Sequence, residues 1–370
     1  MAKAADAYTA AFLPAVPRRL STMRISELCR RLQASGALPC HVHRVLRLWS
    51  NALPQETTKR PQEDYLPRSV RDVLPALEAD LASLAQVQSE HPATDGSARL
   101  LVRLGDGQTV ESVLLPRDGV CVSSQVGCAV GCVFCMTGQG GLIRQLGSAE
   151  MVAQVVLARQ RRPVRKVVFM GMGEPAHNLD NVMEAIELLG TGGGIGHKNL
   201  VFSTVGDARV FERLPTGPVK PALALSLHST RADLRARLLP RAPQIDPADL
   251  VAAGERYARA TGYPIQYQWT LIEGVNDGEE ELDGIVRLLG GKYAVMNLIP
   301  YNSVEGLPFA RPAWERAREI ARSLHRRGVL TKLRQSAGQE VDAGCGQLRA
   351  RAVPRGRAAV VHPAEGLAVR

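Results

Sequence analysis

The amino-acid sequence predicts an α/β protein whose main body, residues 119–348, is a partial (β/α)6-type barrel. A small helical domain over residues 21–90 and a β-hairpin extension over residues 98–118 precede it. Three observations support this prediction. Strand-like and helical patterns alternate six or seven times after Gly119, the strands are uninterrupted apolar runs, and polar residues directly follow several of them. Such strands are typical of a parallel sheet covered on both faces, for which a doubly wound sheet is the alternative.

The composition is that of a soluble globular protein and favours a polyanionic partner. Of the 370 residues, 45% are hydrophobic and 22% are charged, enough for one large core or two smaller ones. The 46 Lys and Arg outnumber the 36 Asp and Glu, a net charge of +10, so nucleic acid is the first partner to consider. The sequence has no run of about 18 apolar residues and a poor signal peptide, so we expect a cytoplasmic protein without membrane contact.

The N-terminal region predicts three helices. Residues 1–20 have no clear period and are expected to be disordered. Apolar residues then recur at helical spacing in the segments 25–32, 42–49 and 70–84. Basic side chains on the second segment, Arg44 and Arg47 among them, make RNA contact one interpretation of this domain; a packing subdomain is the other. Cys29 is interpreted as a core cysteine and Cys40 as a loop cysteine.

The next segment predicts a β-hairpin. Two apolar, β-branched runs, Ala98–Leu104 and Thr109–Leu115, flank the turn signal Gly105-Asp106-Gly107. This hairpin leads the chain directly to the first strand of the barrel and to a group of four cysteines.

The barrel region is then predicted element by element. Short apolar runs give strands, and segments with caps and helical spacing give helices. Ser148 is a candidate N-cap, Asp246-Pro247 begins a helix that Gly262 ends, and Gly328 ends the last helix. The predicted strands are Val120–Ser123, Lys166–Met170, Leu200–Ser203, Ala222–Leu225, Ile265–Ile272, Val295–Ile299 and Val329–Leu333, and the main helices are Ala149–Arg161, Asn181–Leu189, 247–261, Asp277–Leu289 and 312–327.

Polar residues after these strands predict a common site. In a β/α barrel the carboxyl ends of the strands build the active site. We therefore expect one mouth to gather the cysteine loop and five polar side chains, namely Glu174, Ser203, Ser226, His228 and Asn302.

Three cysteines in eight residues, Cys128, Cys132 and Cys135, form a C-x3-C-x2-C run. A zinc ribbon would need a second cysteine pair, and disulfides in so short a loop would be strained and leave one thiol over. A [4Fe–4S] cluster bound by three thiolates has neither difficulty and keeps one iron open. Cys121 lies outside this spacing.

An open iron after the first barrel strand and a Gly-Glu pair after the second indicate radical S-adenosylmethionine chemistry. The amino and carboxylate groups of the methionine moiety chelate the open iron, and the sulfonium is cleaved to a 5′-deoxyadenosyl radical. Glu174 could accept a hydrogen bond from the ligand's ammonium, while Ser203, Ser226 and Asn302 could hold its ribose and carboxylate. Taken singly, each of these residues could instead serve as a local cap or turn residue.

Several longer motifs resemble the RlmN/Cfr family of radical S-adenosylmethionine RNA adenine methyltransferases. They occur in family order over residues 98–350. The matching stretches are Cys121-Val-Ser-Ser-Gln-Val-Gly-Cys128, Phe134-Cys135-Met-Thr-Gly, Val168-Phe-Met-Gly-Met-Gly-Glu174-Pro175, Ser203-Thr-Val-Gly, Leu225-Ser-Leu-His228, Gly274-Val-Asn-Asp277, Asn297-Leu-Ile-Pro-Tyr-Asn302 and Asp342-Ala-Gly-Cys345-Gly-Gln-Leu.

The resemblance implies 2-methyladenosine formation in 23S rRNA, with tRNA as a further substrate. One S-adenosylmethionine methylates Cys345, and a second gives the radical that abstracts hydrogen from this S-methyl group. The resulting carbon radical adds to adenine C2, a base matched by Glu111 removes the ring proton, and Cys121 attacks Cys345 to release the product and leave a disulfide. The implied cofactor-binding residues are Gly173, Glu174, Ser203, Ser226, Leu227, His228 and Asn302, with one cluster on Cys128, Cys132 and Cys135.

The resemblance also implies an electron donor such as flavodoxin and a monomeric enzyme. Three stretches depart from the family pattern: Arg241-Ala-Pro after Leu239-Pro240, the strand segment 266–270 and the basic tail 349–370. These departures concern the RNA target. The alternatives are therefore a paralogue that modifies another adenosine, methylation at adenine C8, or an iron–sulfur protein that binds RNA without catalysis, against which the presence of both Cys121 and Cys345 argues.

Overall fold

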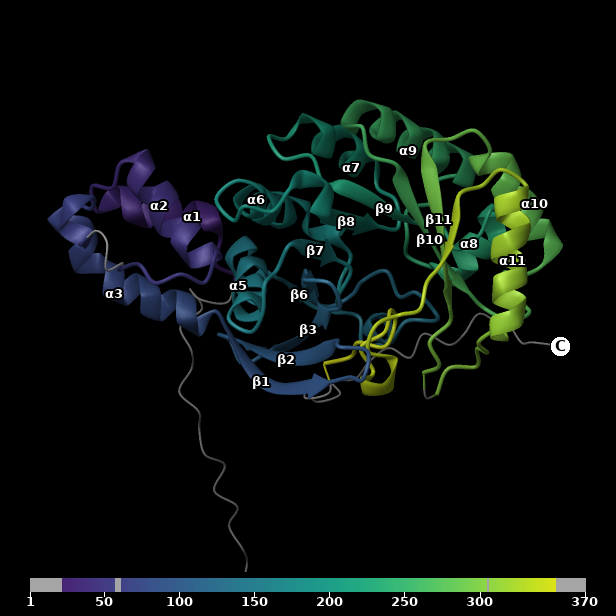
Figure 1. Ribbon diagram of the computed structural model, residues 1–370, viewed down its shortest axis with the longest axis horizontal. Helices are drawn as coiled ribbons and strands as arrows, with labels where there is room; N and C mark the ends of the chain where they lie inside the picture. The colour runs from purple at the N-terminus through teal and green to yellow at the C-terminus, as the bar shows by residue number, and fades with distance from the viewer. Residues whose placement is uncertain (1–21, 57–60, 305, 351–370) are drawn as a thin grey trace, which may run out of the picture.

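A computed structural model describes residues 22–56, 61–304 and 306–350 (Figure 1). The predicted disordered segment 1–20 lies outside the described residues, as does all of the basic tail except residues 349 and 350. The described chain forms one large sheet flanked by helices. Its main hydrophobic core joins the N-terminal helices, the extension and the barrel, and a second, smaller cluster lies around the cysteine loop. No helix in these ranges is both long and apolar enough to cross a bilayer.

Seven parallel strands in chain order form the barrel sheet: β4 (Gly119–Cys121), β7 (Lys166–Phe169), β8 (Leu200–Thr204), β9 (Ala222–Ser226), β10 (Ile265–Leu271), β11 (Ala294–Pro300) and β12 (Thr331–Leu333). Because the strand order never reverses, the doubly wound alternative is wrong. No pairing joins β12 to β4 within the described ranges, so the barrel is open. The prediction of a partial barrel is confirmed.

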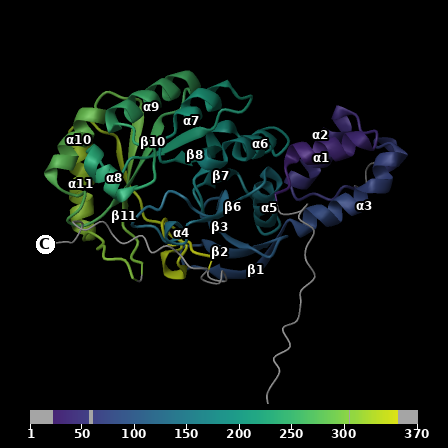
Figure 2. The ribbon, with the colours of Figure 1, turned by 180° about the vertical axis from the view of Figure 1, so that it is seen from behind.

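Helices cover the outer face of the curved sheet: α5 (Ser148–Arg159), α6 (Leu179–Gly190), α7 (Ala208–Arg213), α8 (Ala232–Leu238), α9 (Pro247–Thr261), α10 (Glu279–Leu289) and α11 (Trp314–Arg326) (Figure 2). As predicted, Asp246 caps α9 by accepting a hydrogen bond from the Ala248 amide, and Gly262 ends it in the left-handed conformation. The prediction that Ser148 caps α5 is wrong. Gly147 holds that position, and the Ser148 hydroxyl instead accepts a bond from the Ile25 amide at 2.8 Å.

Three N-terminal helices, α1 (Ile25–Ala34), α2 (Pro39–Ser50) and α3 (Arg68–Ser83), pack against α5 and α6 at one end of the molecule (Figure 1). Cys29 is partly buried against the core, as predicted, whereas Cys40 is exposed in the first turn of α2 and not in a loop. The Arg44 guanidinium stacks 3.5 Å from the centre of the Tyr65 ring, so one predicted RNA donor takes part in packing.

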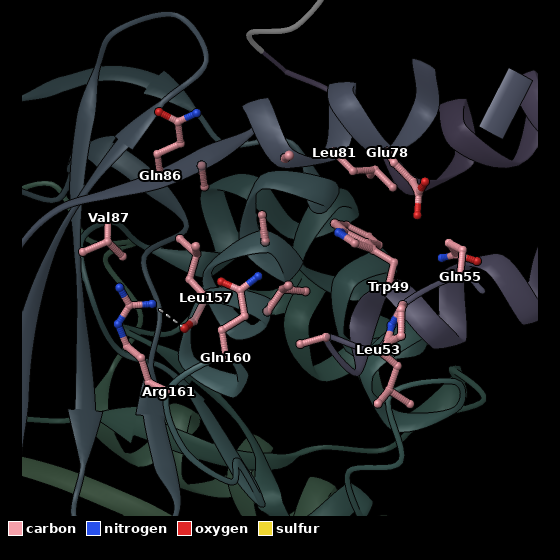
Figure 3. Close-up of a pocket in the computed structure, with 16 residues that line it drawn as sticks. Trp49, Leu53, Gln55, Glu78, Leu81, Gln86, Val87, Leu157, Gln160 and Arg161 are labelled. Carbon is pink, nitrogen blue, oxygen red and sulfur yellow. Dashed lines mark hydrogen bonds between the residues drawn. The ribbon is translucent and has the colours of Figure 1, made fainter. Parts of the chain in front are cut away.

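A cavity opens where these helices meet the sheet (Figure 3). Trp49 and Leu53 line it from the α2 side, Leu81 from α3, and Leu157 from α5. This cavity shares no lining residue with the two cavities near the cysteines.

The hairpin extension contains one strand more than predicted. Strands β2 (Ala98–Leu104) and β3 (Thr109–Leu115) form the predicted hairpin, and β1 (Ala85–Pro92) pairs antiparallel with β2. Strand β3 pairs antiparallel with β4 and thereby joins the extension to the barrel sheet. The segment after β12 runs from the far edge of the sheet down to this extension (Figure 1).

Candidate active site

The three closely spaced cysteines line one cavity at the carboxyl ends of the barrel strands. Cys128, Cys132 and Cys135 lie between the small strands β5 (Gln125–Gly127) and β6 (Leu142–Gln145), which pair as a hairpin. Gly127 has φ 77°, and a Cβ atom at this position would overlap the carbonyl oxygen of Gly141. The glycine therefore permits the tight turn that begins the cysteine run.

Most of the predicted polar residues line the same cavity. Glu174 follows β7, Ser203 lies in β8, and Ser226 and His228 lie at the end of β9. The sequence interpretation missed Gln268 and Thr270 of β10 and Tyr301 after β11, which also line it. A usable signal was present, because Gln266, Gln268 and Thr270 alternate with buried apolar residues and so mark a polar face of that strand.

The thiols fit a cluster better than a single ion. Within the described chain no three His, Cys, Asp or Glu side chains could hold one metal ion. A four-iron cluster does not require such convergence, because each cysteine binds a different iron. Burial raises the pKa of the Cys128 thiol to about 12 and raises the pKa values of Cys132 and Cys135 as well. Ionised thiolates here therefore require nearby positive charge, which iron supplies.

A buried arginine that the sequence interpretation missed supplies further positive charge. Arg235 of α8 is 3% exposed and donates hydrogen bonds to the carbonyl oxygens of Val205 and Ser226. Burial lowers its pKa to about 10, while the charges of Cys132 and Glu174 act in the opposite direction. Arg235 therefore remains a cation and stabilises negative charge on both groups.

Glu174 lies deep in the cavity wall. Its Oε1 accepts a hydrogen bond from the Ala176 amide at 3.1 Å and its Oε2 accepts one from the Val205 amide at 3.0 Å. Burial outweighs these bonds and raises the pKa of Glu174 to about 7. Gly173 permits the backbone that leads to Glu174 to pass close to Gln125, because a Cβ atom at residue 173 would lie 2.6 Å from the Gln125 side chain. The Thr204 hydroxyl also donates a hydrogen bond to this carboxylate, so one lone pair remains for a ligand.

His228 and Leu227 have different surroundings. Burial lowers the pKa of His228 to about 3, so the imidazole is neutral. Its Nδ1 accepts a hydrogen bond from the Thr270 amide at 3.0 Å, which leaves the proton on Nε2. Its ring contacts Phe134 edge to face. The Leu227 side chain is fully buried in the core and does not line the cavity.

Cys345 lines the cavity of the three cysteines and also a second cavity beside it. Cys121 of β4 lines this second cavity, together with Val113, Val168 and Met170. The Cys345 side chain faces open space in the cavities, yet its surroundings are dense enough that burial raises the pKa of the thiol. All seven cysteines are free thiols, so the Cys121–Cys345 disulfide implied by the resemblance is not formed in this structure.

The loop that carries Cys345 is tethered on two opposite sides. The Asn302 Nδ2 donates to the Cys345 carbonyl and to the Ser336 hydroxyl, each at 2.9 Å. On the opposite side, the Met136 amide donates to the Gly346 carbonyl at 2.8 Å and the Thr137 hydroxyl to the Leu348 carbonyl at 2.7 Å. Asn302 thus lies outside the lining of the main cavity and binds the loop.

Glu111 lies on the same face of β3 as Val113, which lines the second cavity, but does not line either cavity itself. The side chain is buried and forms an ion pair with Arg99. Its Oε2 also accepts hydrogen bonds from the amides of Arg349 at 2.8 Å and Ala350 at 3.2 Å. The segment after Cys345 therefore covers this carboxylate.

Comparisons with known proteins agree with this geometry. Residues 122–289 match the model of the radical SAM superfamily. The chain is 74% identical over 344 residues to a probable RNA methyltransferase of Methylibium petroleiphilum, covering 93% of this chain and 97% of the relative. It is 68% identical to a probable RNA methyltransferase of Pseudomonas aeruginosa, and this match covers 89% of this chain and 96% of that relative.

A solved structure shares the fold. The crystal structure of a radical SAM methyltransferase from Sphaerobacter thermophilus superposes with a TM-score of 0.77 at 36% identity, covering 90% of this chain and 100% of that one. Because the match covers 90% of this chain, the similarity is not confined to the barrel. The chain belongs to the radical SAM superfamily and, within it, to the RlmN/Cfr-like family of RNA methyltransferases.

Proposed function

We propose that this protein methylates C2 of an adenosine in 23S rRNA, giving 2-methyladenosine, with tRNA as a second substrate. The observation that carries this proposal is the position of Cys345, which lines both the cavity of the three cysteines and the cavity of Cys121. A sulfur that carries a methyl group towards a radical source and later forms a disulfide needs access to both places.

The main cavity suits one [4Fe–4S] cluster on Cys128, Cys132 and Cys135 together with S-adenosylmethionine. When bound, these two cofactors supply a 5′-deoxyadenosyl radical. Glu174 would accept a hydrogen bond from the ligand's ammonium through its remaining lone pair, and Gly173 would let the backbone approach closely. The buried Tyr301 hydroxyl has no partner among the described residues and could donate to the same ligand. The hydroxyls of Ser203 and Ser226 would hold its ribose and carboxylate, beside the backbone of Leu227 and His228.

In the proposed reaction, Cys345 carries the methyl group to the base. Adenine C2 has no useful nucleophilicity, so it does not attack the sulfonium directly. Instead Cys345 would be methylated first, a hydrogen atom would be removed from its S-methyl group, and the resulting carbon radical would add to the ring. The adduct would then give one electron back to the oxidised cluster and lose its ring proton. Cys121 then attacks the Cys345 sulfur, which forms a disulfide and releases the methylated RNA. An external thiol reductant restores both thiols.

Glu111 is proposed as the acceptor of the ring proton. In this structure both of its oxygens are engaged, one by Arg99 and the other by the amides of residues 349 and 350. Glu111 can therefore act only after this segment has moved away. Such movement fits the cycle, because the same loop carries Cys345 to the RNA and back to Cys121.

The proposal extends to partners and location. Reduction of the cluster requires an electron donor such as flavodoxin, and the net charge of +10 suits an RNA partner. We assign RNA contact to the helical domain and propose a monomeric, cytoplasmic enzyme.

Anaerobic reconstitution with iron and sulfide, followed by incubation with S-adenosylmethionine, a reductant and unmodified rRNA or tRNA, tests the proposal. Mass spectrometry should find S-methylcysteine at Cys345, and digested RNA should contain 2-methyladenosine. Formation of 8-methyladenosine would assign the chain to the C8 alternative, and methylation confined to another adenosine would make it a paralogue. A loaded cluster and RNA binding without any methylated Cys345 would leave only the non-catalytic alternative.

A further inference from the structure

Three cations lie on the inner face of the open barrel and line neither cavity of the candidate active site. Lys332 of β12 is in register with Asn297, which is in register with Gln268, a residue that lines the main cavity. Residues in register in a parallel sheet project from the same face, so Lys332 faces the lumen. Arg334 follows two residues later and shares that face.

Lys166 approaches from the opposite side of the lumen. It precedes Val168 by two residues in β7, and Val168 lines the cavity of Cys121 and Cys345. Alternation along the strand therefore directs Lys166 into the lumen as well. Desolvation and then the charges of Arg334 and Lys332 lower the pKa of Lys166, so all three groups are close enough to repel one another.

Among the described residues, no carboxylate forms an ion pair with this group. The side chains of Lys166, Lys332 and Arg334 form neither an ion pair nor a hydrogen bond with any described residue. Lys332 and Arg334 are exposed, and Lys166 is partly buried. Only seven lysines occur in the chain, against 39 arginines, and two of them converge here. Three like charges held together without a counterion repel one another, and an anion between them would replace this repulsion by attraction.

We propose that Lys166, Lys332 and Arg334 bind a phosphate group of the RNA backbone next to the target nucleotide. This inference rests on the proposed function, because it takes RNA as the substrate. Lysine ammonium groups are compact point charges that neutralise phosphate from any direction, and arginine adds a planar donor fork. Arg334 is also near the reacting sulfur, since its charge acts on the Cys345 thiol.

The position of Lys332 and Arg334 at the edge of the barrel favours binding of the RNA backbone over binding of a free anion. Strand β12 is the last strand of the open sheet, so a polymer can reach Lys332 and Arg334 from outside while its base enters the cavity. A phosphate fixed here would hold one nucleotide in register with Cys345. Phosphate contacts position a nucleic acid but do not read its sequence.

Lysine footprinting on the full-length wild-type protein tests the site without any substitution. Brief acetylation is followed by mass spectrometry of the peptides containing Lys166 and Lys332, with the exposed Lys198 and Lys220 as internal controls. Substrate RNA should protect Lys166 and Lys332 but neither control. Inorganic phosphate alone serves as the second probe and should protect them only at much higher concentration than RNA.

Matched variants then give a second measurement. The double variant Lys166→Gln/Lys332→Gln and the control Lys198→Gln/Lys220→Gln remove the same charge. We expect the lumen variant to bind RNA about tenfold more weakly than the control. The slope of its log affinity against log salt concentration should be smaller by about one, which corresponds to one counterion fewer released. Because it removes repulsion, the lumen variant should melt no earlier than the wild type, which separates a binding defect from misfolding.

Protection by phosphate without protection by RNA would assign the site to a free anion and overturn the proposal. Absence of protection by either probe, or equal RNA binding and salt dependence in the two double variants, would also overturn it. The proposed function is judged separately, because wild-type protein that forms methyladenosine while Lys166 and Lys332 stay unprotected retains the reaction and loses only this phosphate site.

Discussion

The side chain of Asn302 donates a hydrogen bond from Nδ2 to the backbone carbonyl oxygen of Cys345 at 2.9 Å. The same Nδ2 donates to the Ser336 hydroxyl, while the buried Oδ1 has no partner in the described chain. Asn302, two residues after the end of β11, thus holds the loop that positions the Cys345 sulfur between the two cavities. In this conformation Asn302 positions Cys345 and does not itself line the main cavity.

Replacing Asn302 by alanine should loosen this loop. Loss of the two hydrogen bonds should destabilise the seated loop by about 1–2 kcal/mol, so hydrogen exchange of residues 343–348 should accelerate about tenfold. Alkylation of Cys345 should accelerate relative to that of the exposed Cys40. The control is Asn181→Ala, which removes a side-chain hydrogen bond from the Asn181 amide to Asn178 at the outer helices. Equal exchange in both variants would show that Asn302 does not hold the loop.

Each of Cys128, Cys132 and Cys135 should be required for cluster loading. Substitution by alanine leaves two thiolates, too few to retain a cluster that already has an open iron. After anaerobic reconstitution we expect iron and sulfide near zero per chain and no visible absorption band. Cys29→Ala and Cys40→Ala should load normally, because neither thiol lines the cysteine cavity. Normal loading of any of the three variants would remove that cysteine from the ligand set.

Cys121→Ala should trap the protein on its RNA. Without the second thiol, the Cys345 sulfur cannot be released from the adduct by disulfide formation. Denaturing gels should show an RNA-dependent, nuclease-sensitive band with Cys121→Ala, and none with Cys121→Ala/Cys345→Ala. If Cys121→Ala turns over as the wild type does, another group resolves the adduct.

Breaking the buried ion pair between Arg99 and Glu111 should destabilise the fold. Glu111→Gln leaves the Arg99 guanidinium buried without its counter-charge, which should reduce the free energy of unfolding by about 3 kcal/mol. Arg99→Met/Glu111→Leu should recover much of this loss in urea titrations, because it removes both charges. It should not recover methylation, since the proposed proton acceptor is absent. Equal stability of the single and double variants would contradict the pairing.

The stability of the metal-free protein should depend on pH through Glu174. Burial raises its pKa from 4.5 to about 7, so the folded protein keeps a proton that the unfolded chain loses between these pH values. This contribution to stability is complete below pH 4.5 and falls by about 3 kcal/mol as the pH rises to about 7, where it levels off. The difference in unfolding free energy between wild type and Glu174→Gln should follow this curve. A difference that is constant across the range would show that Glu174 titrates normally.

Several features of the site were predictable because parallel strands end at the same edge of a sheet. This rule alone placed Glu174, Ser203, Ser226 and His228 together, and their convergence is found. It failed for Asn302, whose amide turns to the Cys345 loop, and it overlooked Gln268, which lies inside its strand and not after it. Such details depend on curvature of the sheet and on contacts between segments far apart in sequence.

By itself, the sequence determined the seven barrel strands and the five longer helices, because local apolar spacing and caps set them, but the short helices α7 and α8 were not predicted. It also determined the cysteine spacing, because residues so close together cannot separate far in space. Only the tertiary structure decided that Cys345 lies between two cavities, that Glu111 is covered, and that Lys166 faces Lys332. These relationships join residues more than 150 positions apart, and only the curvature of the open sheet and the packing of its last loop bring such residues together.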